Sequence, residues 1–268
     1  LPFRRIKRVL VFLPFVCLFG ALILTYKLYD WNADIEWLVT FMYLLFVKFS
    51  LGSSGWPHST ASPSHLLCVL IPFRDRDSEL AQFAPYMHDF LSRQGIPHTF
   101  FVLNQTDHYR FNRAALINVG WFESDRTGCD YIVMHDVDLL PSNPSLNYSY
   151  PGEGIVRHIS SPEYHPKYKY ANFIGGILML TLRDYKKVNG MSNKYFGWGL
   201  EDDEFFLRIR DAGLKIDRPR NLTTDRETTF KHVHGAERKR DYTKRMAAAE
   251  KAEKRKRDRM GGLSNARW

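Results

Sequence analysis

Cysteine is scarce in this chain: only Cys17, Cys68 and Cys129 occur among 268 residues. So few cysteines exclude the class of small secreted domains that depend on a disulfide framework. Cys68 and Cys129 lie in apolar, strand-like runs, and we expect them to be buried free thiols, with a Cys68–Cys129 disulfide as the alternative. The sequence therefore predicts a fold that does not rest on disulfides.

The middle of the chain lacks an excess of positive charge. The formal net charge is +9, but residues 1–8 hold four basic side chains and no acidic one, and residues 236–268 hold 12 basic and 5 acidic ones. Residues 9–235 hold 22 basic and 24 acidic side chains. Proteins that bind nucleic acid usually carry a basic binding face. The charge pattern thus argues against a nucleic-acid partner.

An uncharged run of 18 residues, Val9–Tyr26, lies near the start. As a helix it measures about 27 Å at about 1.5 Å per residue, close to the roughly 30 Å of a bilayer core. Basic residues precede it and acidic residues follow it, so the positive-inside rule leaves the N-terminus cytosolic. We expect a type II membrane anchor, with a cleaved signal peptide as the alternative. The predicted parts are a cytosolic tail (1–8), a transmembrane anchor (9–29), a stem or linker (30–64) and one globular domain (65–268).

Three glycosylation sequons, at Asn104, Asn147 and Asn221, support a lumenal position for the globular domain. Within this domain, apolar runs alternate with helical patterns. The runs at 65–71, 99–103 and 131–134 predict strands, and the segments 80–94 and 112–124 predict helices. This alternation predicts an α/β fold with a parallel sheet. Ligands bind such sheets beyond the carboxyl ends of the strands.

Charged residues follow two of the predicted strands. Arg74 and Arg76 come after the first, where guanidinium groups suit a phosphate or a nucleotide; a pair of ion-paired surface arginines is the alternative. Asp136 and Asp138 follow the third. If this backbone is extended, the two carboxylates face the same side and can bind a divalent cation and, through it, a diphosphate. An isolated Asp-x-Asp pattern is common, so its position after a strand is what favours the site.

His232 and His234 form a second alternating pair. In an extended segment their imidazoles face the same way and, with a carboxylate, complete a metal site. Mixed nitrogen and oxygen ligands favour Mn²⁺ or another borderline ion over Ca²⁺. Two solvated loop histidines are the alternative.

The segment Tyr195–Phe205 joins an aromatic and glycine-rich loop to four consecutive acids, residues 201–204. Glycines allow the backbone to bend around a ligand, and Trp198 offers a flat face to a sugar. Acids beside such a face indicate proton abstraction from a carbohydrate hydroxyl. The alternative is a helix N-terminus, where acids interact favourably with the helix dipole.

Taken together and in order, these segments resemble the β-1,4-galactosyltransferase family over about residues 66–265. The motifs that carry the resemblance are Pro72–Arg76, Phe111–Ala114, His135–Pro141, Gly175–Gly176, Asn189–Asn193 and Gly197–Glu204. The paired histidines and the segment Glu163–Tyr170 are similar to the branch of the family that adds galactose to xylose on proteoglycan core proteins.

The resemblance implies a GT-A type nucleotide-diphospho-sugar transferase fold, behind the transmembrane helix, in the Golgi membrane. It implies Mn²⁺ as cofactor, UDP-galactose as donor and a xylosylated proteoglycan core protein as acceptor, joined at the xylose 4-hydroxyl with inversion. The alternatives are an N-acetylglucosamine acceptor, a GalNAc donor, or a non-catalytic sugar-binding relative. It also implies a lid over about 235–258 that closes over the donor, with a plain solvated helix as the alternative.

The implied site residues fall into four groups. Asp202 is the general base, at a pKa near the usual value of about 4, and Glu204 alone keeps the role of a plain helix-terminal acid. The metal ligands are Asp138, His232 and His234. The acceptor-binding residues are Tyr170, Asp202 and Asp203. The donor-binding residues are Pro72, Phe73, Arg74, Arg76, Phe111, Arg113, Asp136, Val137, Tyr168, Trp198 and Glu201.

Overall fold

A computed structural model describes residues 65–232, 258 and 261–267. The predicted tail, anchor and stem lie outside these residues, as do His234 and all of the predicted lid except Asp258. None of the helices in the described ranges combines the length and apolar character that crossing a membrane requires.

Six strands form the central sheet, in the order β2-β1-β3-β6-β5-β7. The strands are β1 (Leu67–Phe73), β2 (His98–Asn104), β3 (Tyr131–His135), β5 (Ile155–His158), β6 (Ile177–Thr181) and β7 (Lys215–Asp217). The three strands predicted from the sequence are confirmed within two residues at each end, and β1 pairs in parallel with both β2 and β3.

The sheet is mixed rather than parallel throughout, so the prediction of a parallel sheet is wrong beyond β3. Strand β6 runs antiparallel to both β3 and β5, and β7 then runs parallel to β5. Parallel neighbours need a long crossover, usually a helix. No helix separates β5 from β6 in this described stretch, and the two strands pair in the antiparallel direction.

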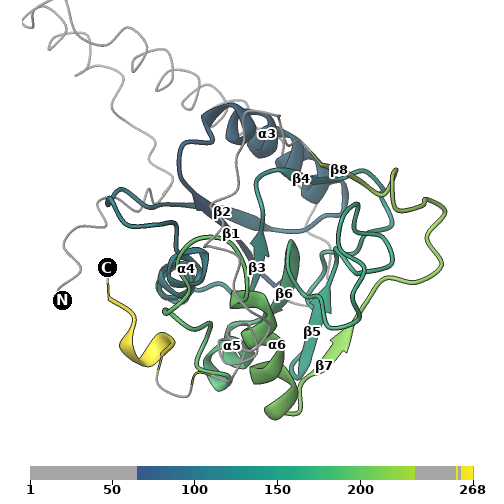
Figure 1. Cartoon of the computed structure of the whole chain (residues 1–268). Helices are drawn as coiled ribbons and strands as arrows, with labels where there is room; N and C mark the ends of the chain where they lie inside the picture. The colour runs from purple at the N-terminus through teal and green to yellow at the C-terminus, as the bar shows by residue number, and fades with distance from the viewer. Residues whose placement is uncertain (1–64, 233–257, 259–260, 268) are drawn as a thin grey trace, which may run out of the picture. The chain divides into compact units, whose positions relative to one another are not determined.

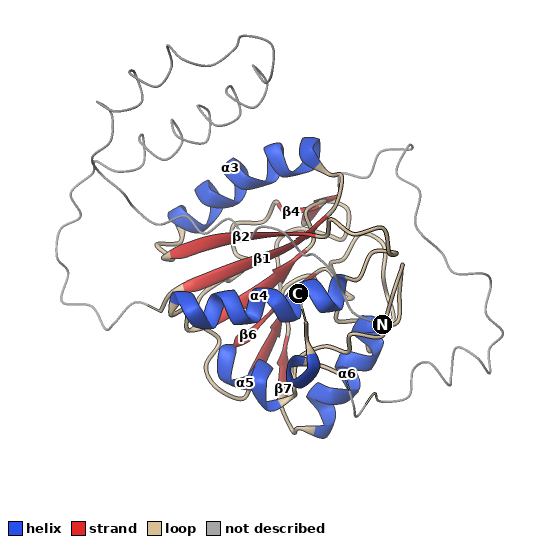
Figure 2. Cartoon of the chain, turned by 90° about the vertical axis from the view of Figure 1, so that its left-hand side faces the viewer, coloured by secondary structure: helices blue, strands red, loops and turns tan. Residues whose placement is uncertain are grey.

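Helices cover both faces of the sheet (Figures 1 and 2). Helix α3 (Asp77–Arg93) packs on one face, and α4 (Arg113–Thr127), α5 (Leu182–Lys187) and α6 (Glu201–Asp211) pack on the other. The two predicted helices are confirmed as α3 and α4. Alternate residues of β1 face the two cores: Cys68 and Leu70 join the α4 side, and Val69 and Ile71 join the α3 side.

A separate two-stranded ladder lies on the α3 side of the sheet. Its strands are β4 (Leu139–Pro141) and β8 (Phe230–His232), which pair antiparallel with Leu139 opposite His232. Phe230 and Leu139 are both buried in the core beneath α3. This ladder fixes the positions of the residues just before β4 and at the end of β8, where the predicted metal ligands lie.

The structure corrects the expectation of free thiols. Cys68 in β1 and Cys129, just after α4, form a disulfide with their Cα atoms 6.0 Å apart. Both side chains are buried. Parallel pairing of β1 with β3 explains the proximity, because Cys68 lies opposite Ile132, three residues beyond Cys129.

Candidate active site

The candidate site lies where β1 and β3 end and helix α6 begins. Arg74 follows β1 directly, and Asp136 follows β3. Helix α4 begins at Arg113, whose Nε and Nη2 atoms each lie 2.9 Å from Asp136 Oδ1. The parallel strands thus bring together residues that lie far apart in the sequence, as expected at the carboxyl edge of a sheet.

Arg74 holds its own loop together. Its guanidinium donates to the carbonyl oxygens of Gln105 (3.1 Å), Asp107 (3.2 Å) and Tyr109 (2.7 Å), and to Asp107 Oδ1 (3.1 Å). It also lies 5.9 Å from the centre of the Phe111 ring. These contacts shape the loop between β2 and α4, which carries Phe111 to the edge of the site.

Arg76 is ion-paired as well, because its Nη1 donates to Glu79 Oε1 at 3.0 Å. Pro72 and Phe73 close β1 as buried residues, and Val137 is buried beneath the turn after β3. Ion-paired arginines were the alternative to a phosphate site. The donor-binding role of all these residues stays a prediction.

The Asp136–Asp138 segment is a turn, not an extended strand, which corrects the alternation argument. The backbone N–H of Leu139 donates to the carbonyl of Asp136 at 3.3 Å, closing the turn before β4. The two carboxylates therefore have different partners. Asp136 pairs with Arg113, whereas Asp138 faces β8.

Asp138 and His232 are the two predicted metal ligands that the structure places. The β4–β8 ladder brings Asp138 Oδ2 to 3.8 Å from His232 Nε2. Two donors that share a cation each lie about 2 Å from it, so this separation fits a shared ion. His234 lies outside the described residues, and within the described ranges no third His, Cys, Asp or Glu completes a cluster. One carboxylate and one imidazole are a donor set that suits Mn²⁺.

The four acids form the first turn of α6, so the two interpretations of this run coincide. Leu200 precedes the helix with a left-handed backbone (φ 78°) and gives it no side-chain cap. The acids interact favourably with the N-terminal end of the helix dipole. The same turn also directs Asp202 into the site.

Asp202 is half-buried, and its pKa is raised to about 8, with burial as the largest cause and the neighbouring Glu201 and Asp203 carboxylates as further causes. The Arg113 guanidinium and the backbone N–H of Asp203, 2.9 Å from Asp202 Oδ1, act in the opposite direction. The expectation of a pKa near 4 is therefore wrong. Desolvation destabilises the charged form more than nearby positive charge restores it.

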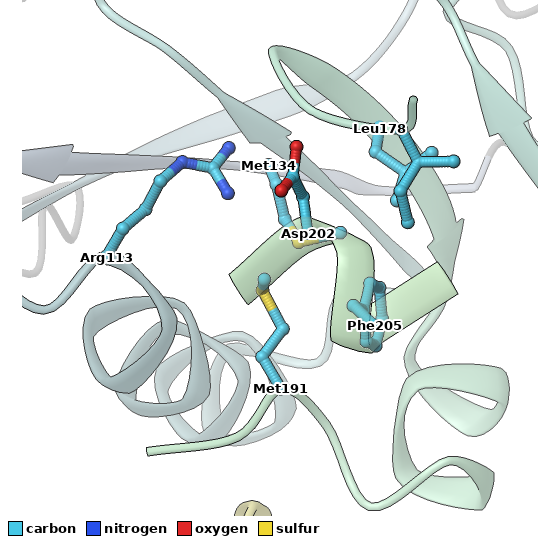
Figure 3. Close-up of a pocket in the computed structure, with 7 residues that line it drawn as sticks. Arg113, Met134, Leu178, Met191, Asp202 and Phe205 are labelled. Carbon is cyan, nitrogen blue, oxygen red and sulfur yellow. The ribbon is translucent and has the colours of Figure 1, made fainter. Parts of the chain in front are cut away.

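Asp202 and Arg113 line a small pocket between α4, α6 and the sheet. Its other lining residues are Met134, Ile174, Leu178, Met191 and Phe205. Figure 3 shows the Arg113 guanidinium and the Asp202 carboxylate on the same side of this pocket. Gly175 gives Asp202 its space, because a Cβ there would lie 2.6 Å from Asp202 Oδ2 and 2.8 Å from Phe173 Cε2.

Glu201 contributes a second buried carboxyl group. Its Oε2 atom is buried and has no hydrogen-bond partner among the residues that the structure describes. Burial raises the pKa of Glu201, while Arg113 lowers it. A buried acceptor with unused capacity is suited to a ligand hydroxyl.

An aromatic surface lies beside these acids. The rings of Tyr168 and Trp198 lie 6.2 Å apart at 32°, and Tyr170 packs edge-on against Phe173 at 5.5 Å. Tyr170 and Trp198 are each 45% exposed. The Tyr170 hydroxyl also hydrogen-bonds to Asp203. Partial burial of the hydroxyl is the largest cause that raises the pKa of Tyr170, and the negative charge of the adjacent carboxylates adds to it. Exposed rings next to carboxylates form a surface that suits a sugar.

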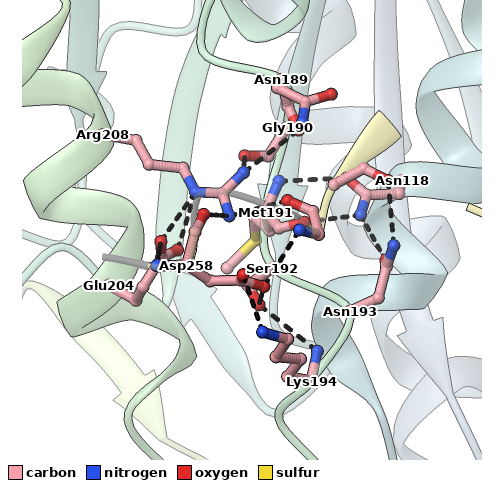
Figure 4. A network of polar contacts seen from close by, with 12 residues as sticks. Asn118, Asn189, Gly190, Met191, Ser192, Asn193, Lys194, Glu204, Arg208 and Asp258 are labelled. Atoms are coloured by element: carbon pink, nitrogen blue, oxygen red, sulfur yellow. Dashed lines mark hydrogen bonds and ion pairs between the residues drawn. The ribbon is translucent and has the colours of Figure 1, made fainter. Parts of the chain in front are cut away.

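Sequence reasoning missed the role of Glu204. It is fully buried and forms two hydrogen bonds with Arg208 Nε, at 2.9 and 2.8 Å. Arg208 also donates to the carbonyl oxygens of Asn189, Gly190, Asp258 and Gly261 (Figure 4). The i,i+4 spacing of Glu204 and Arg208 was the available signal.

This buried network connects α6 to two other segments. Asp258 accepts hydrogen bonds from Ser192 Oγ (2.6 Å) and pairs with Lys194 Nζ (2.9 Å), and its backbone N–H donates to Glu204 Oε1 (2.9 Å). Asn118 in α4 binds Met191 and Asn193 (Figure 4). The network fixes the helix that carries Asp202 to α4.

Fold and site together define a glycosyltransferase catalytic domain, and comparison with known proteins agrees. A family model described as the N-terminal region of glycosyl transferase group 7 matches residues 46–151. A second model, described as the N-terminal domain of galactosyltransferase, matches residues 156–233.

The relatives specify the family. The xylosylprotein 4-beta-galactosyltransferase of Caenorhabditis elegans is 58% identical over 213 residues, covering 79% of this chain and 74% of that protein. Beta-1,4-galactosyltransferase 7 is 54% identical in Drosophila melanogaster and 51% in Homo sapiens. This chain spans 65% of the fly protein and 64% of the human one. The chain belongs to the β-1,4-galactosyltransferase family.

Solved structures share the fold. A crystal structure of a Drosophila β-1,4-galactosyltransferase 7 mutant, in complex with manganese, UDP-Gal and xylobiose, matches with a TM-score of 0.70 and 53% identity. The match covers 75% of this chain and 84% of that one. The catalytic domain of the same Drosophila enzyme in complex with xylobiose matches equally well, with a TM-score of 0.70 and 54% identity.

Proposed function

We propose that this chain is a Mn²⁺-dependent, inverting galactosyltransferase. It transfers galactose from UDP-α-galactose to the 4-hydroxyl of xylose on a proteoglycan core protein, in the synthesis of the glycosaminoglycan linker. One observation carries this proposal: Asp202 lies half-buried in the first turn of α6, close enough to interact electrostatically with both Arg113 and Tyr170. The names and ligands of the relatives support the same donor, metal and acceptor.

The predicted metal ligands are Asp138, His232 and His234. The 3.8 Å between Asp138 Oδ2 and His232 Nε2 supports the first two. When bound, Mn²⁺ supplies Lewis-acid stabilisation of the departing diphosphate.

Asp202 acts as the general base. Its carboxylate takes the proton of the xylose 4-hydroxyl while that oxygen attacks the anomeric carbon of galactose. UDP departs from the opposite face of the sugar, so an α-linked donor gives a β-linked product.

The residues beside Asp202 orient the acceptor. Asp203, with Tyr170 bonded to it, holds the sugar hydroxyls, and Trp198 packs against the sugar ring. Glu201 offers its unpaired Oε2 to a donor-sugar hydroxyl. This arrangement places the 4-hydroxyl at Asp202, and correct placement contributes much of the rate enhancement.

The same proposal includes the GT-A fold and a type II position in the Golgi membrane, with the domain in the lumen. The parallel β2-β1-β3 unit, followed by an Asp-x-Asp turn, supports the fold.

The Cys68–Cys129 disulfide supports an oxidising compartment, as the Golgi lumen is. Protease treatment of intact microsomes tests the position: a lumenal domain is protected until detergent is added, and cleavage without detergent would contradict it.

The enzymatic test is an acceptor panel. UDP release is measured with Mn²⁺, UDP-galactose and either a β-xyloside or N-acetylglucosamine, and then with UDP-GalNAc as donor. We expect turnover on the β-xyloside with UDP-galactose, abolished by EDTA. Turnover on N-acetylglucosamine alone, or a preference for UDP-GalNAc, would reject the substrate assignment. Sugar binding without turnover would indicate a non-catalytic relative.

A further inference from the structure

Arg226 holds the loop that carries the aromatic surface. Its Nη1 donates to the carbonyl oxygens of His165 (2.5 Å) and Tyr168 (3.3 Å), and its Nη2 donates to the carbonyl of Pro162 (2.5 Å). Hydrogen bonds from a charged group are stronger than those between neutral groups. One side chain thus connects three carbonyls of a loop that contains no helix or strand.

The backbone around Arg226 is itself firmly held. Asp225 Oδ1 accepts hydrogen bonds from the N–H groups of Glu227 (3.0 Å) and Thr228 (2.9 Å), which closes a tight turn around Arg226. The turn is bonded to the body of the fold, because Asn143 Nδ2 donates to Thr224 Oγ1 (2.8 Å) and Ser142 N–H donates to the Thr229 carbonyl (2.8 Å). Arg226 therefore projects from a fixed point.

Two further contacts hold the same loop, residues 162–173, from the same segment. The N–H of Leu222 donates to Tyr164 Oη at 3.2 Å. Arg218 Nη2 donates to the carbonyls of Ala171 (2.8 Å) and Phe173 (3.1 Å). The segment 218–226 is thus the support on which the loop rests.

The loop carries Tyr168 and Tyr170 to the site. Within it, His165 Nδ1 accepts the N–H groups of Lys167 (3.0 Å) and Tyr168 (3.1 Å), and the His165 ring packs against Phe173 at 4.9 Å. Arg226 binds this folded turn from outside. The supporting segment continues directly into β8, which ends at His232, so the aromatic surface and the metal ligand are held by one stretch of chain.

We propose that Arg226 is a positioning residue that fixes loop 162–173 and thereby sets the affinity for the sugar acceptor. The inference rests on the proposed function. It also departs from the sequence prediction that Tyr168 and Trp198 bind the donor: because Tyr168 packs against Trp198 and Phe173, and Phe173 contacts the predicted acceptor residue Tyr170, it assigns the whole aromatic surface to the acceptor. Arg226 touches backbone carbonyls of the loop and acts on the sugar only through Tyr168 and Tyr170. It follows that loss of Arg226 weakens acceptor binding much more than donor binding.

The test compares steady-state kinetics of Arg226→Met, Arg226→Lys and the control Arg220→Met, in the same chain as wild type. Arg220 is an exposed arginine on the same segment. We expect Arg226→Met to raise KM for the β-xyloside at least tenfold while KM for UDP-galactose changes less than twofold. Arg226→Lys keeps the positive charge but loses the planar guanidinium that donates to several carbonyls at once. Its KM for the acceptor therefore falls between those of wild type and Arg226→Met. Arg220→Met behaves like wild type.

A merely structural role gives a different result, since it lowers the amount of active enzyme and hence the apparent kcat, with both KM values unchanged. That outcome, or an equal rise in both KM values, would overturn the proposal. If Arg226→Met fails to fold, Arg226→Lys still decides by the same comparison. If wild type uses N-acetylglucosamine instead of the xyloside, the substrate assignment fails, and the KM comparison on that acceptor still tests Arg226.

Discussion

Among single residues, Asp202 shows how burial changes the pKa of a carboxyl group and hence its strength as a base. A carboxylate at a solvated helix terminus keeps a pKa near 4, but Asp202 lies in a mostly apolar pocket that raises its pKa to about 8. A base with a raised pKa accepts a proton more readily once it is ionised. Arg113 limits the shift and keeps part of the population in the charged form at neutral pH.

This pKa gives the enzyme a predicted pH profile. Only the ionised carboxylate accepts a proton, so kcat/KM rises with pH up to about 8 and levels off above it. Initial rates on the acceptor between about pH 6 and pH 9 measure the profile. An exposed-site control, Asp125→Asn in α4, follows the same curve. A profile that is flat over this range would show that Asp202 is fully ionised and that the account of its burial is wrong.

Gly175 is a second residue to test at this site, because its lack of a side chain leaves room for the Asp202 carboxylate. Gly175→Ala places a Cβ within 2.6 Å of Asp202 Oδ2, and the carboxylate must move. Since small misplacements of catalytic groups are costly, we expect kcat to fall by about 10²-fold, with a change in unfolding midpoint of only a few degrees. Gly128→Ala is the control for activity: its Cβ meets nothing within 4 Å, so kcat should stay at the wild-type value, although its left-handed backbone (φ 77°) makes the substitution destabilising. Wild-type kcat in Gly175→Ala would contradict the close approach.

At the scale of elements, helix α6 depends on one buried ion pair. Glu204 and Arg208 are 0% and 2% exposed, and Arg208 donates hydrogen bonds to backbone carbonyls of two other segments. Removing one partner leaves an uncompensated buried charge. The helix terminus that carries Asp202 is therefore stabilised by a buried residue, Glu204, that follows Asp202 by two positions.

Glu204→Gln and Arg208→Met should each lower the free energy of unfolding by about 3–5 kcal/mol. The exposed pair on the same helix, Arg210–Asp211, is the control, and Arg210→Met should cost less than about 1 kcal/mol. Urea denaturation followed by circular dichroism measures both. Equal effects of the buried and exposed substitutions would show that the network does not hold α6.

The sequence predicted these elements unevenly, for physical reasons. Strands β1 to β3 and helices α3 and α4 follow from local apolar patterns and short connections. The direction of β6 depends on long-range pairing that no local pattern encodes. Likewise, the turn at Asp136 was mistaken for a strand, because period-two spacing does not distinguish the two. The sequence alone could not distinguish Glu204 from the other three acids of the run, because only the fold buries Glu204 completely.

At the scale of the whole molecule, a disulfide connects the first strand to the chain after α4. It closes a loop with a sequence separation of 61, and such a constraint on the unfolded chain contributes about 3–5 kcal/mol. The double substitution Cys68→Ala, Cys129→Ala should lower stability by that amount, measured by urea denaturation without reductant. Cys17→Ala is the control. Stability unchanged by the double substitution would mean that the thiols are free, as the sequence had suggested.

The tertiary fold also explains which parts of the site could be predicted from the sequence. The motif residues lie far apart in the sequence, and the resemblance to a family was what identified them as site residues. Their neighbours in space come from the tertiary fold alone, as Arg226 beneath the tyrosine loop and Gly175 against Asp202 show. Spacing within one segment carries no information about such contacts.

The central claim is that Asp202 directs inverting transfer of galactose to the 4-hydroxyl of xylose. The most direct measurement is nuclear magnetic resonance of the product formed from UDP-galactose and a β-xyloside with Mn²⁺, for wild type and for Asp202→Asn. The account predicts a β-galactosyl group on O4 of xylose from wild type, and a rate lower by about 10²–10⁴-fold from Asp202→Asn. An α-linked product, a linkage at another hydroxyl, or full activity of Asp202→Asn would contradict it.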